Sequence, residues 1–557
     1  MQVPKHFVKA EYSKTGVRQY DNNPFIEALP PIILSVKQAG SSLKGQVEFE
    51  PSDRLAPPKA RMHMVVSLLD DFFQPLSQHI LLEERLGMMI RRGYVGRNLN
   101  DGSLNQKLQE GYELIKSGES SSINFATEKT TARSMSLIGI SGGGKSSSLN
   151  RILETYPQVI YHESTNFIQI SYLKIECPSN GDLESLCLNF FSAVDSILET
   201  DYERRYANRR LSVPKMLALM RQTANHRAIG VLVIDEIQRL SQVRSGGKEQ
   251  MLEFFVELVN QVGIPVVLVG TPKARPIFEL ELQSGRRSAG IGSIYWETIQ
   301  KKTEKKGYGL VDNPNWVAFT NSLWKYQWLK HGDDPLTDEI RDCWYDLSQG
   351  VLDIVVKLFV LAQLRAIANK RERITVGILK SVYDQELKPV QPMLDALRSG
   401  NADMIVKYSD LRVLDLEKRL IELGSQIMSS AQKEEEGLFG GNNEALKLFN
   451  LMLQLDGNYD KTILVALIKR MFKESPELSF TEMLPSMINW YKEYTAEEKV
   501  NKKVSKINTV KRKDWYDLDK EDLRYLFDYS ESEGLNLSDN LEQRGLFFNL
   551  EDWAANY

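Results

Sequence analysis

Residues 139–146 constrain the fold of this chain more than any other stretch. They read Gly-Ile-Ser-Gly-Gly-Gly-Lys-Ser and match the phosphate-binding pattern G-x-x-x-x-G-K-[ST] at every fixed position. The apolar run 134–138 before them is typical of a buried strand, and residues 146–153 are typical of a helix start. Glycines let backbone N–H groups surround anionic oxygens, and a helix N-terminus adds partial positive charge. We therefore interpret the stretch as a triphosphate site rather than a chance glycine-rich loop.

Each residue of this loop has an expected role. Lys145 is expected to reach the β- and γ-phosphates of ATP, and the Ser146 hydroxyl is expected to bind Mg²⁺. The loop residues expected to bind the nucleotide are Gly139, Ser141, Gly142, Gly143, Gly144, Lys145, Ser146 and Ser147.

An acidic pair supplies the second half of a hydrolytic site. The apolar run 231–234 ends in Asp235 and Glu236, and Asp235 lies 90 residues after Lys145. Asp235 is expected to hold Mg²⁺ and so to contact the bound nucleotide, and Glu236 is expected to polarise the attacking water. A further apolar strand, 264–270, leads to Thr271, whose hydroxyl can hydrogen-bond the γ-phosphate or the water. The pattern predicts a Mg²⁺-dependent ATPase.

Two stretches carry cations that could complete the site. Arg286 and Arg287 lie between the strand at 264–270 and the next one at 293–296. They could form an exposed loop in a monomer; in a ring or filament, one of them could reach the γ-phosphate of a neighbour, which we favour without choosing between the two. Lys357 lies two turns into a helix that follows Gly350. It is either a lid residue that contacts the nucleotide or part of ordinary helix packing.

Two basic stretches could contact nucleic acid locally. The formal net charge of −4 excludes a globally basic surface. The loop at 238–248 contains Arg239, Arg244 and Lys248, which could neutralise duplex phosphates or simply be solvated. The stretch 91–98 contains three arginines and could be a phosphate- or DNA-contacting loop or a solvated turn.

The chain is too long, at 557 residues, for one ordinary domain. Short apolar runs, including 169–176 as a second strand, alternate with helix-length segments and predict a parallel sheet covered on both faces. Residues 305–395 show no strand pattern, and seven basic residues between 499 and 513 suggest an extended segment. The expected regions are an N-terminal extension (1–60), an α/β ATPase domain (61–300), an all-helical lid (301–400), a helical region (401–495) and a basic tail (496–557).

An apolar block between prolines lies in the N-terminal extension. Residues 23–31 read Asn-Pro-Phe-Ile-Glu-Ala-Leu-Pro-Pro. Prolines at both ends favour an extended or turn-bounded segment. Such a block is either a docking peptide for a partner protein or a segment that packs back on its own domain.

Cysteine usage and hydropathy indicate the compartment. Three cysteines with no close pair predict neither a disulfide framework nor a zinc site. The N-terminus lacks the apolar core of a signal peptide, and the apolar runs are far shorter than the roughly 20 residues that span a bilayer. We expect a cytoplasmic protein with reduced thiols and no membrane partner.

The order of phosphate loop, acidic strand, Thr271, arginine pair and helical segment resembles the AAA+ ATPase plan. Seven stretches also resemble the TnsC family, the AAA+ regulators of Tn-seven-like transposons, related to the MuB, TniB and IstB ATPases. They are residues 23–31, 71–76, 93–98, 156–162, 234–238, 270–275 and 355–366. One departure is Ser146, where threonine is commoner in the family; serine offers the same hydroxyl.

The resemblance implies an α/β fold with an AAA+ P-loop core, a parallel sheet, an all-helical lid and a mostly helical C-terminal extension. It also implies an ATP-dependent protein that assembles as rings or filaments on double-stranded target DNA. Such a protein takes its cue from a target-selector protein and recruits or activates the transposase. The C-terminal tail would dock the endonuclease subunit of the transposase, and the N-terminal part would meet the selector.

Two other functions are compatible with the same fold. A helicase loader or replication-initiation ATPase would need a helicase-docking segment, and its flanking segments should not resemble those of this chain. A non-hydrolysing adaptor could use nucleotide only as a structural clamp. The presence of Glu236 argues against that adaptor, because a clamp needs no base.

Overall fold

The computed structural model divides the chain into two compact units, Met1–Ala431 and Gln432–Tyr557. The residues that it describes are 7–117, 134–207, 211–240, 254–255, 257–259, 262–275, 277, 292–305, 309–411, 424–425, 439–440, 442–455, 459–475, 480–504, 511–519, 522–537 and 540–541. Among them, no helix is both long and apolar enough to cross a lipid bilayer.

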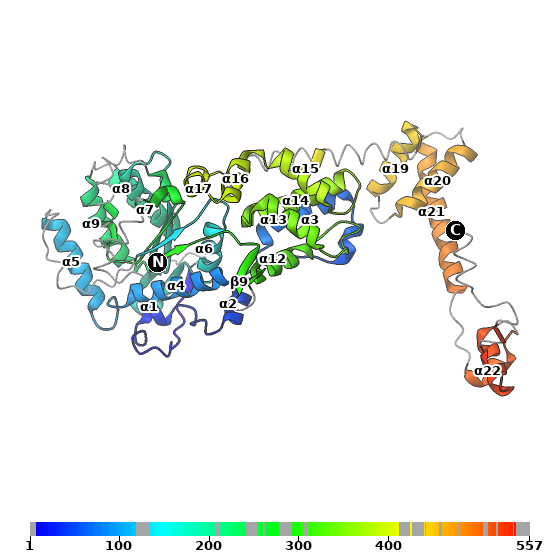
Figure 1. Cartoon of the computed structure of the whole chain (residues 1–557), viewed down its shortest axis with the longest axis horizontal. Coiled ribbons are helices and arrows are strands. Elements are labelled where there is room, and N and C mark those ends of the chain that lie inside the picture. Colours follow the sequence, from blue (N-terminus) through cyan, green and yellow to red (C-terminus); the bar gives the residue numbers. More distant parts are fainter. Residues whose placement is uncertain are drawn as a thin grey trace. The chain divides into compact units, whose positions relative to one another are not determined.

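A five-stranded parallel sheet organises the first unit (Figure 1). Its order is β5 (Tyr172–Glu176), β6 (Val231–Asp235), β7 (Val266–Gly270), β2 (Ser134–Ile138) and β8 (Gly292–Tyr295). All neighbouring strands are parallel, as the sequence predicts. Their carboxyl ends therefore meet at one edge, where Ile138 pairs with Gly270 and Glu176 pairs with Asp235.

Both faces of this sheet are buried, because alternate residues enter different hydrophobic clusters. In β6, Val231 and Val233 belong to one cluster, and Leu232 and Ile234 belong to the other. The first cluster includes residues of α4 (Ser77–Tyr94) and α6 (Lys145–Leu153). The second includes α7 (Leu183–Leu198) and α9 (Val213–His226), with α8 (Tyr202–Ala207) packed on α7 and α5 (Ser103–Ser117) packed on α9. Apolar runs without alternation are the sequence signature of such a two-sided sheet.

The expected single strand at 169–176 is wrong, since the chain forms two strands there. β4 (Phe167–Ile170) pairs antiparallel with β3 (Val159–His162), and β1 (Val8–Lys9) pairs parallel with β3. Only β5 enters the central sheet. Ser171 separates the two strands, and its N–H donates to Gln158 O. Strand-forming residues on both sides of Ser171 conceal this change of sheet in the sequence.

Residues 23–31 pack on their own domain and do not form an accessible docking peptide. α1 (Pro24–Glu27) begins at Asn23, whose side-chain amide donates to Tyr94 O and Arg97 O. Phe25 is 0% exposed and lies in the hydrophobic cluster with Tyr94. Burial of these apolar side chains removes the surface that a partner would bind, so the alternative interpretation holds. After it comes α2 (Val36–Leu43).

Two of the three arginines in residues 91–98 are used inside the unit rather than in a nucleic-acid loop. α4 continues to Tyr94, and Arg97 is 1% exposed. Arg97 donates to Ile229 O at 2.7 Å, and Arg91 donates to Pro30 O at 2.6 Å. These guanidinium groups bind backbone carbonyls inside the unit, so neither faces a phosphate backbone.

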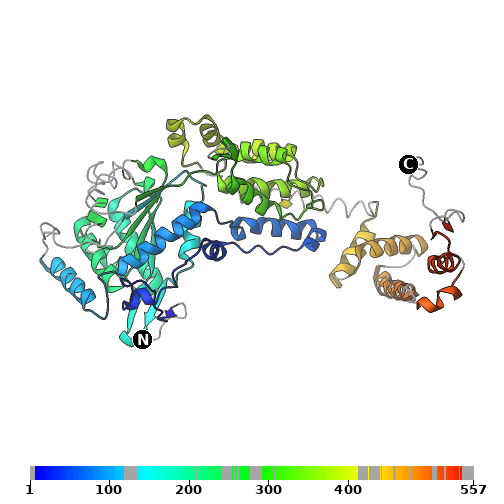
Figure 2. The same ribbon diagram turned by 60° about the horizontal axis from the view of Figure 1, so that its bottom comes forward.

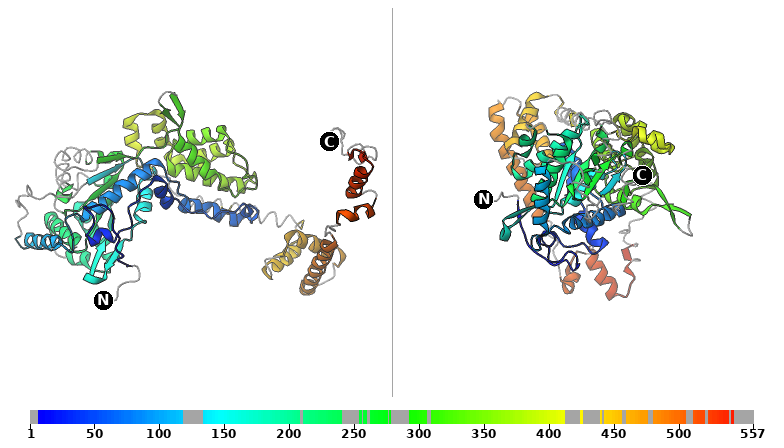
Figure 3. Two further views of the ribbon diagram at one scale, coloured as in Figure 1. Left: turned by 90° about the horizontal axis from the view of Figure 1, so that it is seen from below. Right: turned by 90° about the vertical axis from the view of Figure 1, so that its left-hand side faces the viewer.

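A helical subdomain follows the sheet. Its helices are α12 (Pro314–Trp324), α13 (Asp338–Ser348), α14 (Leu352–Ala368), α15 (Val376–Glu386), α16 (Gln391–Ser399) and α17 (Ala402–Tyr408). The expectation of no strand in this region is wrong, because β9 (Lys302–Lys305) and β10 (Gly309–Asp312) form an antiparallel hairpin, drawn in green in Figure 3. Exposed Leu310 and polar neighbours give this hairpin no apolar alternation that a sequence pattern could reveal.

The helical subdomain also contains a helix from the N-terminal part of the chain. α3 (Pro58–Asp71) places Val65 and Leu68 in the same cluster as Trp344 and Leu358 (Figure 2). The expected boundary at residue 61 assigned this helix to the α/β domain, which the packing contradicts. The apolar stripe of a helix shows that it is buried but not which core it enters.

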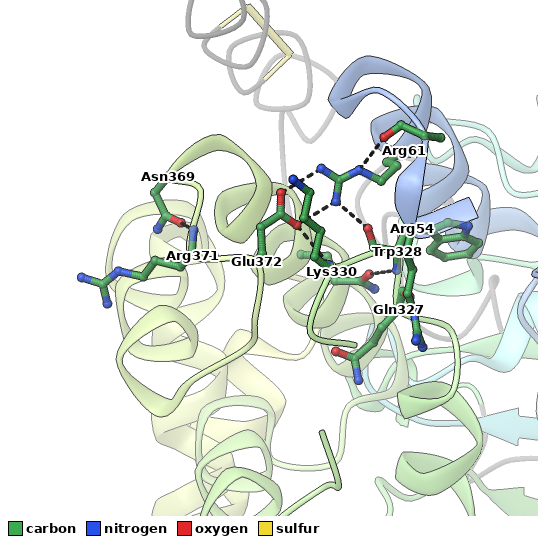
Figure 4. Close-up of polar contacts among 10 residues, drawn as sticks. Arg54, Arg61, Gln327, Trp328, Lys330, Asn369, Arg371 and Glu372 are labelled. Atoms are coloured by element: carbon green, nitrogen blue, oxygen red, sulfur yellow. Dashed lines mark hydrogen bonds and ion pairs between the residues drawn. The ribbon is translucent and has the colours of Figure 1, made fainter. Parts of the chain in front are cut away.

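A buried ion pair holds α3 in place (Figure 4). The Arg61 guanidinium binds both carboxylate oxygens of Glu372 at 2.7 and 2.8 Å, and it also donates to Trp328 O and Ala56 O. The Lys330 N–H adds a hydrogen bond to Glu372. Burial alone would raise the pKa of Glu372, but the hydrogen bonds and charge of Arg61, with the Lys330 contacts, lower it below its ordinary value of 4.5.

The second unit is mostly helical. α19 (Asn443–Leu455), α20 (Lys461–Glu474) and α21 (Phe480–Val504) share one hydrophobic cluster, and a short helical turn (Arg512–Asp517) and α22 (Leu523–Ser532) follow. The expected extended segment at 499–513 is partly wrong, since α21 continues through Lys499, Lys502 and Lys503.

Candidate nucleotide site

A cleft of about 780 Å³ lies at the carboxyl edge of the central sheet. It is lined by the phosphate loop, the ends of β5, β6 and β7, residues at the end of α3, and the first turns of α14. This is the edge at which α/β proteins bind their ligands.

The phosphate loop adopts a shape that requires glycine. Gly142 and Gly144 have φ angles of +74° and +94°, which side chains with a Cβ rarely adopt. A Cβ on Gly139 would approach Trp296 O to 2.4 Å. The Trp296 indole N–H donates to Gly143 O at 2.7 Å, so this side chain fixes the loop from the sheet side.

The Lys145 side chain folds back against the start of the phosphate loop. Its Nζ donates to Gly139 O and to Ile140 O, each at 2.7 Å, and its side chain is buried. Phosphate oxygens are stronger acceptors for an ammonium group than peptide carbonyls because they carry charge. Ser146 and Ser147 line the cleft next to Lys145.

The helical subdomain contacts the loop through backbone atoms. The Asp353 N–H donates to Gly142 O at 3.0 Å, and the Ser141 N–H donates to Ser409 O at 2.7 Å. Lys357 lines the cleft, and its Nζ lies 2.7 Å from Asp353 Oδ2. The structure therefore places Lys357 at the cleft, with a carboxylate partner one turn earlier.

The acidic pair lies opposite the loop. Asp235 is buried; its Oδ1 accepts from the Glu236 N–H, and its Oδ2 lies 3.3 Å from Lys174 Nζ. Glu236 has a left-handed backbone, with φ +60°, which turns the chain sharply after β6. Its carboxylate accepts a hydrogen bond from Gln238 Nε2 at 2.5 Å.

Thr271 directly follows β7 at the same edge. Its hydroxyl is buried and has no hydrogen-bond partner among the residues that the structure describes. A buried hydroxyl without a partner is costly unless a ligand or water satisfies it. The structure thus brings Lys145, Ser146, Asp235, Glu236 and Thr271 to one cleft, and their individual roles stay predictions.

Of the predicted nucleic-acid residues, Arg239 lies beside the cleft without lining it, and the others lie outside the described residues. Arg239 donates to Glu176 Oε2 at 2.9 Å, and its side chain is one-third exposed. Arg244 and Lys248 lie outside the described residues, as do Arg286 and Arg287, the two candidates for a contact with a neighbour's γ-phosphate.

Comparisons with known proteins identify two parts of the chain. The AAA domain family matches residues 128–278, which include the whole phosphate loop and both acidic residues. The family described as Tn7 transposition regulator TnsC matches residues 510–557. The chain is therefore similar to AAA ATPases over residues 128–278 and to the TnsC regulator at its C-terminal end. The fold predicted from the sequence, an AAA+ core with helical extensions, is confirmed.

Three solved structures with partial similarity come from archaea. A Walker-type ATPase of Pyrococcus abyssi is 14% identical, with 58% of this chain and 88% of that chain covered and a TM-score of 0.31. Cdc6p of Pyrobaculum aerophilum is 16% identical, with 73% and 89% covered and a TM-score of 0.30. The ORC2 protein of Aeropyrum pernix is 11% identical, with 59% and 86% covered and a TM-score of 0.28. No curated protein matches the chain.

Three polar residues of this cleft are not predicted from the sequence. Lys174 and Gln238 reach it only through the pairing of β5, β6 and β7. His79 lies between Phe73 and Trp296, and burial lowers its pKa to about 4, so its ring is neutral. Its Nδ1 accepts from the Leu76 N–H. The sequence around His79 does not indicate that it lies beside a cleft, because most of that cleft is formed by residues far away in the chain.

The residues present fit a divalent cation. Asp235 and Ser146 supply carboxylate and hydroxyl oxygens, which Mg²⁺ prefers, and both line the cleft. The ammonium of Lys174 beside Asp235 shows that the site accommodates positive charge there.

Proposed function

We propose that this chain is an ATP-dependent, DNA-binding regulator of transposition. The observation that carries the proposal is the presence, in one chain, of a nucleotide cleft and of a C-terminal segment matched by the TnsC family. The protein assembles as a ring or filament on double-stranded target DNA. It links a target-selector protein to the transposase and activates insertion, and its tail at 496–557 docks an endonuclease subunit.

The cleft residues have separate proposed roles in ATP hydrolysis. Lys145 binds the β- and γ-phosphate oxygens, and Glu236 orients and polarises the attacking water. The partnerless hydroxyl supports Thr271 as the donor to the γ-phosphate or to that water. Ser146 and Asp235 would hold Mg²⁺, which neutralises phosphate charge when bound. Lys357 closes the lid side of the site.

Nucleic acid and neighbouring copies would contact other residues. Arg239, Arg244 and Lys248 bind duplex phosphates, which needs Arg239 to leave Glu176. Arg286 or Arg287 of one copy reaches the γ-phosphate bound by the next. We retain the proposed division of the chain at residues 300, 400 and 495, and add α3 to the lid.

Two variants test this function. Lys145→Ala is expected to abolish ATP binding and, with it, ATP-dependent DNA binding, measured by fluorescence anisotropy of labelled ATP and labelled duplex. Glu236→Gln is expected to bind ATP normally, to lose turnover by about a hundredfold or more, and to stay on DNA. ATP-dependent DNA binding by Lys145→Ala, or normal turnover by Glu236→Gln, would contradict the proposal.

A further inference from the structure

The Gln238 side chain connects two residues of the proposed catalytic site, Glu236 after β6 and Thr271 after β7. Gln238 lies in the short helical turn Ile237–Arg239, directly after the left-handed Glu236. Its Nε2 donates to Glu236 Oε2 at 2.5 Å, and its Oε1 accepts from the Thr271 N–H at 3.1 Å. Gln238 itself lines the cleft.

The chemistry of the partners fixes the orientation of this amide. A backbone N–H can only donate, so the group that faces Thr271 must be the amide oxygen. The amide nitrogen then faces the Glu236 carboxylate, which accepts hydrogen bonds when ionised. Both contacts are satisfied in one orientation, and a flipped amide would lose both.

The local fold explains why residue 238 has this position. The left-handed turn at Glu236 reverses the chain, and the residue two positions later points back over the carboxylate. β6 and β7 are parallel neighbours, with Ile234 paired with Leu268. The residues that follow the two strands therefore lie side by side, within the reach of one glutamine side chain.

We infer that Gln238 is a positioning residue that aligns the Glu236 carboxylate with Thr271. A general base acts efficiently when a third group orients it, and such supporting contacts typically contribute tenfold or more to activity. The inference deepens the proposed ATPase function and rests on it. Gln238 acts through Glu236, so its loss should lower kcat and leave ATP affinity intact.

Two substitutions separate the two hydrogen bonds. Gln238→Ala removes both, whereas Gln238→Glu keeps an acceptor for the Thr271 N–H and loses the donor to Glu236. Both are expected to lower kcat by about tenfold or more, with KM for ATP and binding of labelled ATP changed less than about twofold. Normal kcat in Gln238→Glu would overturn the inference, because it would show that only the anchor to Thr271 matters.

A double-mutant cycle tests whether the effect passes through Glu236. With Glu236→Gln already present, adding Gln238→Ala should change the residual turnover of radiolabelled ATP by less than about twofold. Full additivity would also overturn the inference, since a general structural defect would act independently of Glu236. Gln385→Ala is the matched control: Gln385 hydrogen-bonds Ser381 on α15, away from the cleft, and its loss should leave kcat unchanged.

The failure of this inference differs from the failure of the proposed function. If the chain hydrolyses no ATP, the wild type and every variant are inactive. If only the inference fails, Glu236→Gln impairs turnover while Gln238→Glu does not.

Discussion

Two ion pairs of the first unit differ in how completely they are satisfied. In the Arg61–Glu372 pair, the arginine is 1% exposed, both carboxylate oxygens are bound, and the guanidinium also donates to two backbone carbonyls (Figure 4). In the Lys174–Asp235 pair, the ammonium lies 3.3 Å from the carboxylate, also donates to Asn150 Oδ1 at 2.8 Å, and lines the cleft.

We call the Arg61–Glu372 pair the clamp, because it is a fixed structural contact. We call the Lys174–Asp235 pair exchangeable, because a bound cation can replace Lys174 beside Asp235. A buried pair stabilises a fold only when good geometry and further hydrogen bonds offset its desolvation, and Arg61–Glu372 meets both conditions. Lys174 is less enclosed, because its side chain is 23% exposed, and its Nζ lies farther from its partner carboxylate, at 3.3 Å. The first pair holds α3 on the lid, and the second holds positive charge where the proposed Mg²⁺ would bind.

The largest expected effect comes from breaking the clamp. Arg61→Met leaves Glu372 buried without its cation, and we expect a loss of about 3–5 kcal/mol in the free energy of unfolding. Urea denaturation followed by circular dichroism would measure it. Arg205→Met is the control, because its ion pair with Asp201 is exposed and should contribute less than about 1 kcal/mol. Equal losses in both variants would remove the distinction between the pairs.

A smaller effect is expected from removing the exchangeable cation. Lys174→Met leaves Asp235 free to bind metal without competition, and we expect about tenfold tighter Mn²⁺ binding to the nucleotide-free protein. Electron paramagnetic resonance of free Mn²⁺ would measure it. Lys301→Met is the matched control, since Lys301 pairs with Asp342 outside the cleft. Weaker Mn²⁺ binding by Lys174→Met would show that Lys174 supports the metal site instead.

The smallest expected effect is on how the stability of the protein depends on pH. The pKa of Glu372 is lowered in the folded protein, so the carboxylate contributes stability that is fully present above its ordinary value of 4.5. This contribution is lost as the pH falls below 4.5 through the folded pKa. The unfolding midpoint of the wild type should therefore fall more steeply below pH 4.5 than that of Glu372→Gln. Parallel curves would mean that the clamp does not depend on the charge of Glu372.

Local patterns predict the parts of the site that adjoin one another in sequence. The phosphate loop needs specific glycines and Lys145 at fixed spacing, and Asp235 and Glu236 need only the end of an apolar strand. Gln238 and Lys174 were missed because their contacts depend on which strands become neighbours. For the same reason, the sequence does not show that residues 23–31 are buried, since an apolar block alone does not indicate which surface it covers.

The membership of α3 in the lid bears on how the protein is synthesised. Arg61 and Glu372 are 311 residues apart in the chain, so the lid core cannot close until most of the first unit has left the ribosome. Until then, the apolar face of α3 stays exposed to solvent while the α/β domain folds. Contacts between residues so far apart in the sequence form slowly. A fragment that begins after the central sheet would lack α3, and the apolar surface left on α14 would make it prone to aggregation.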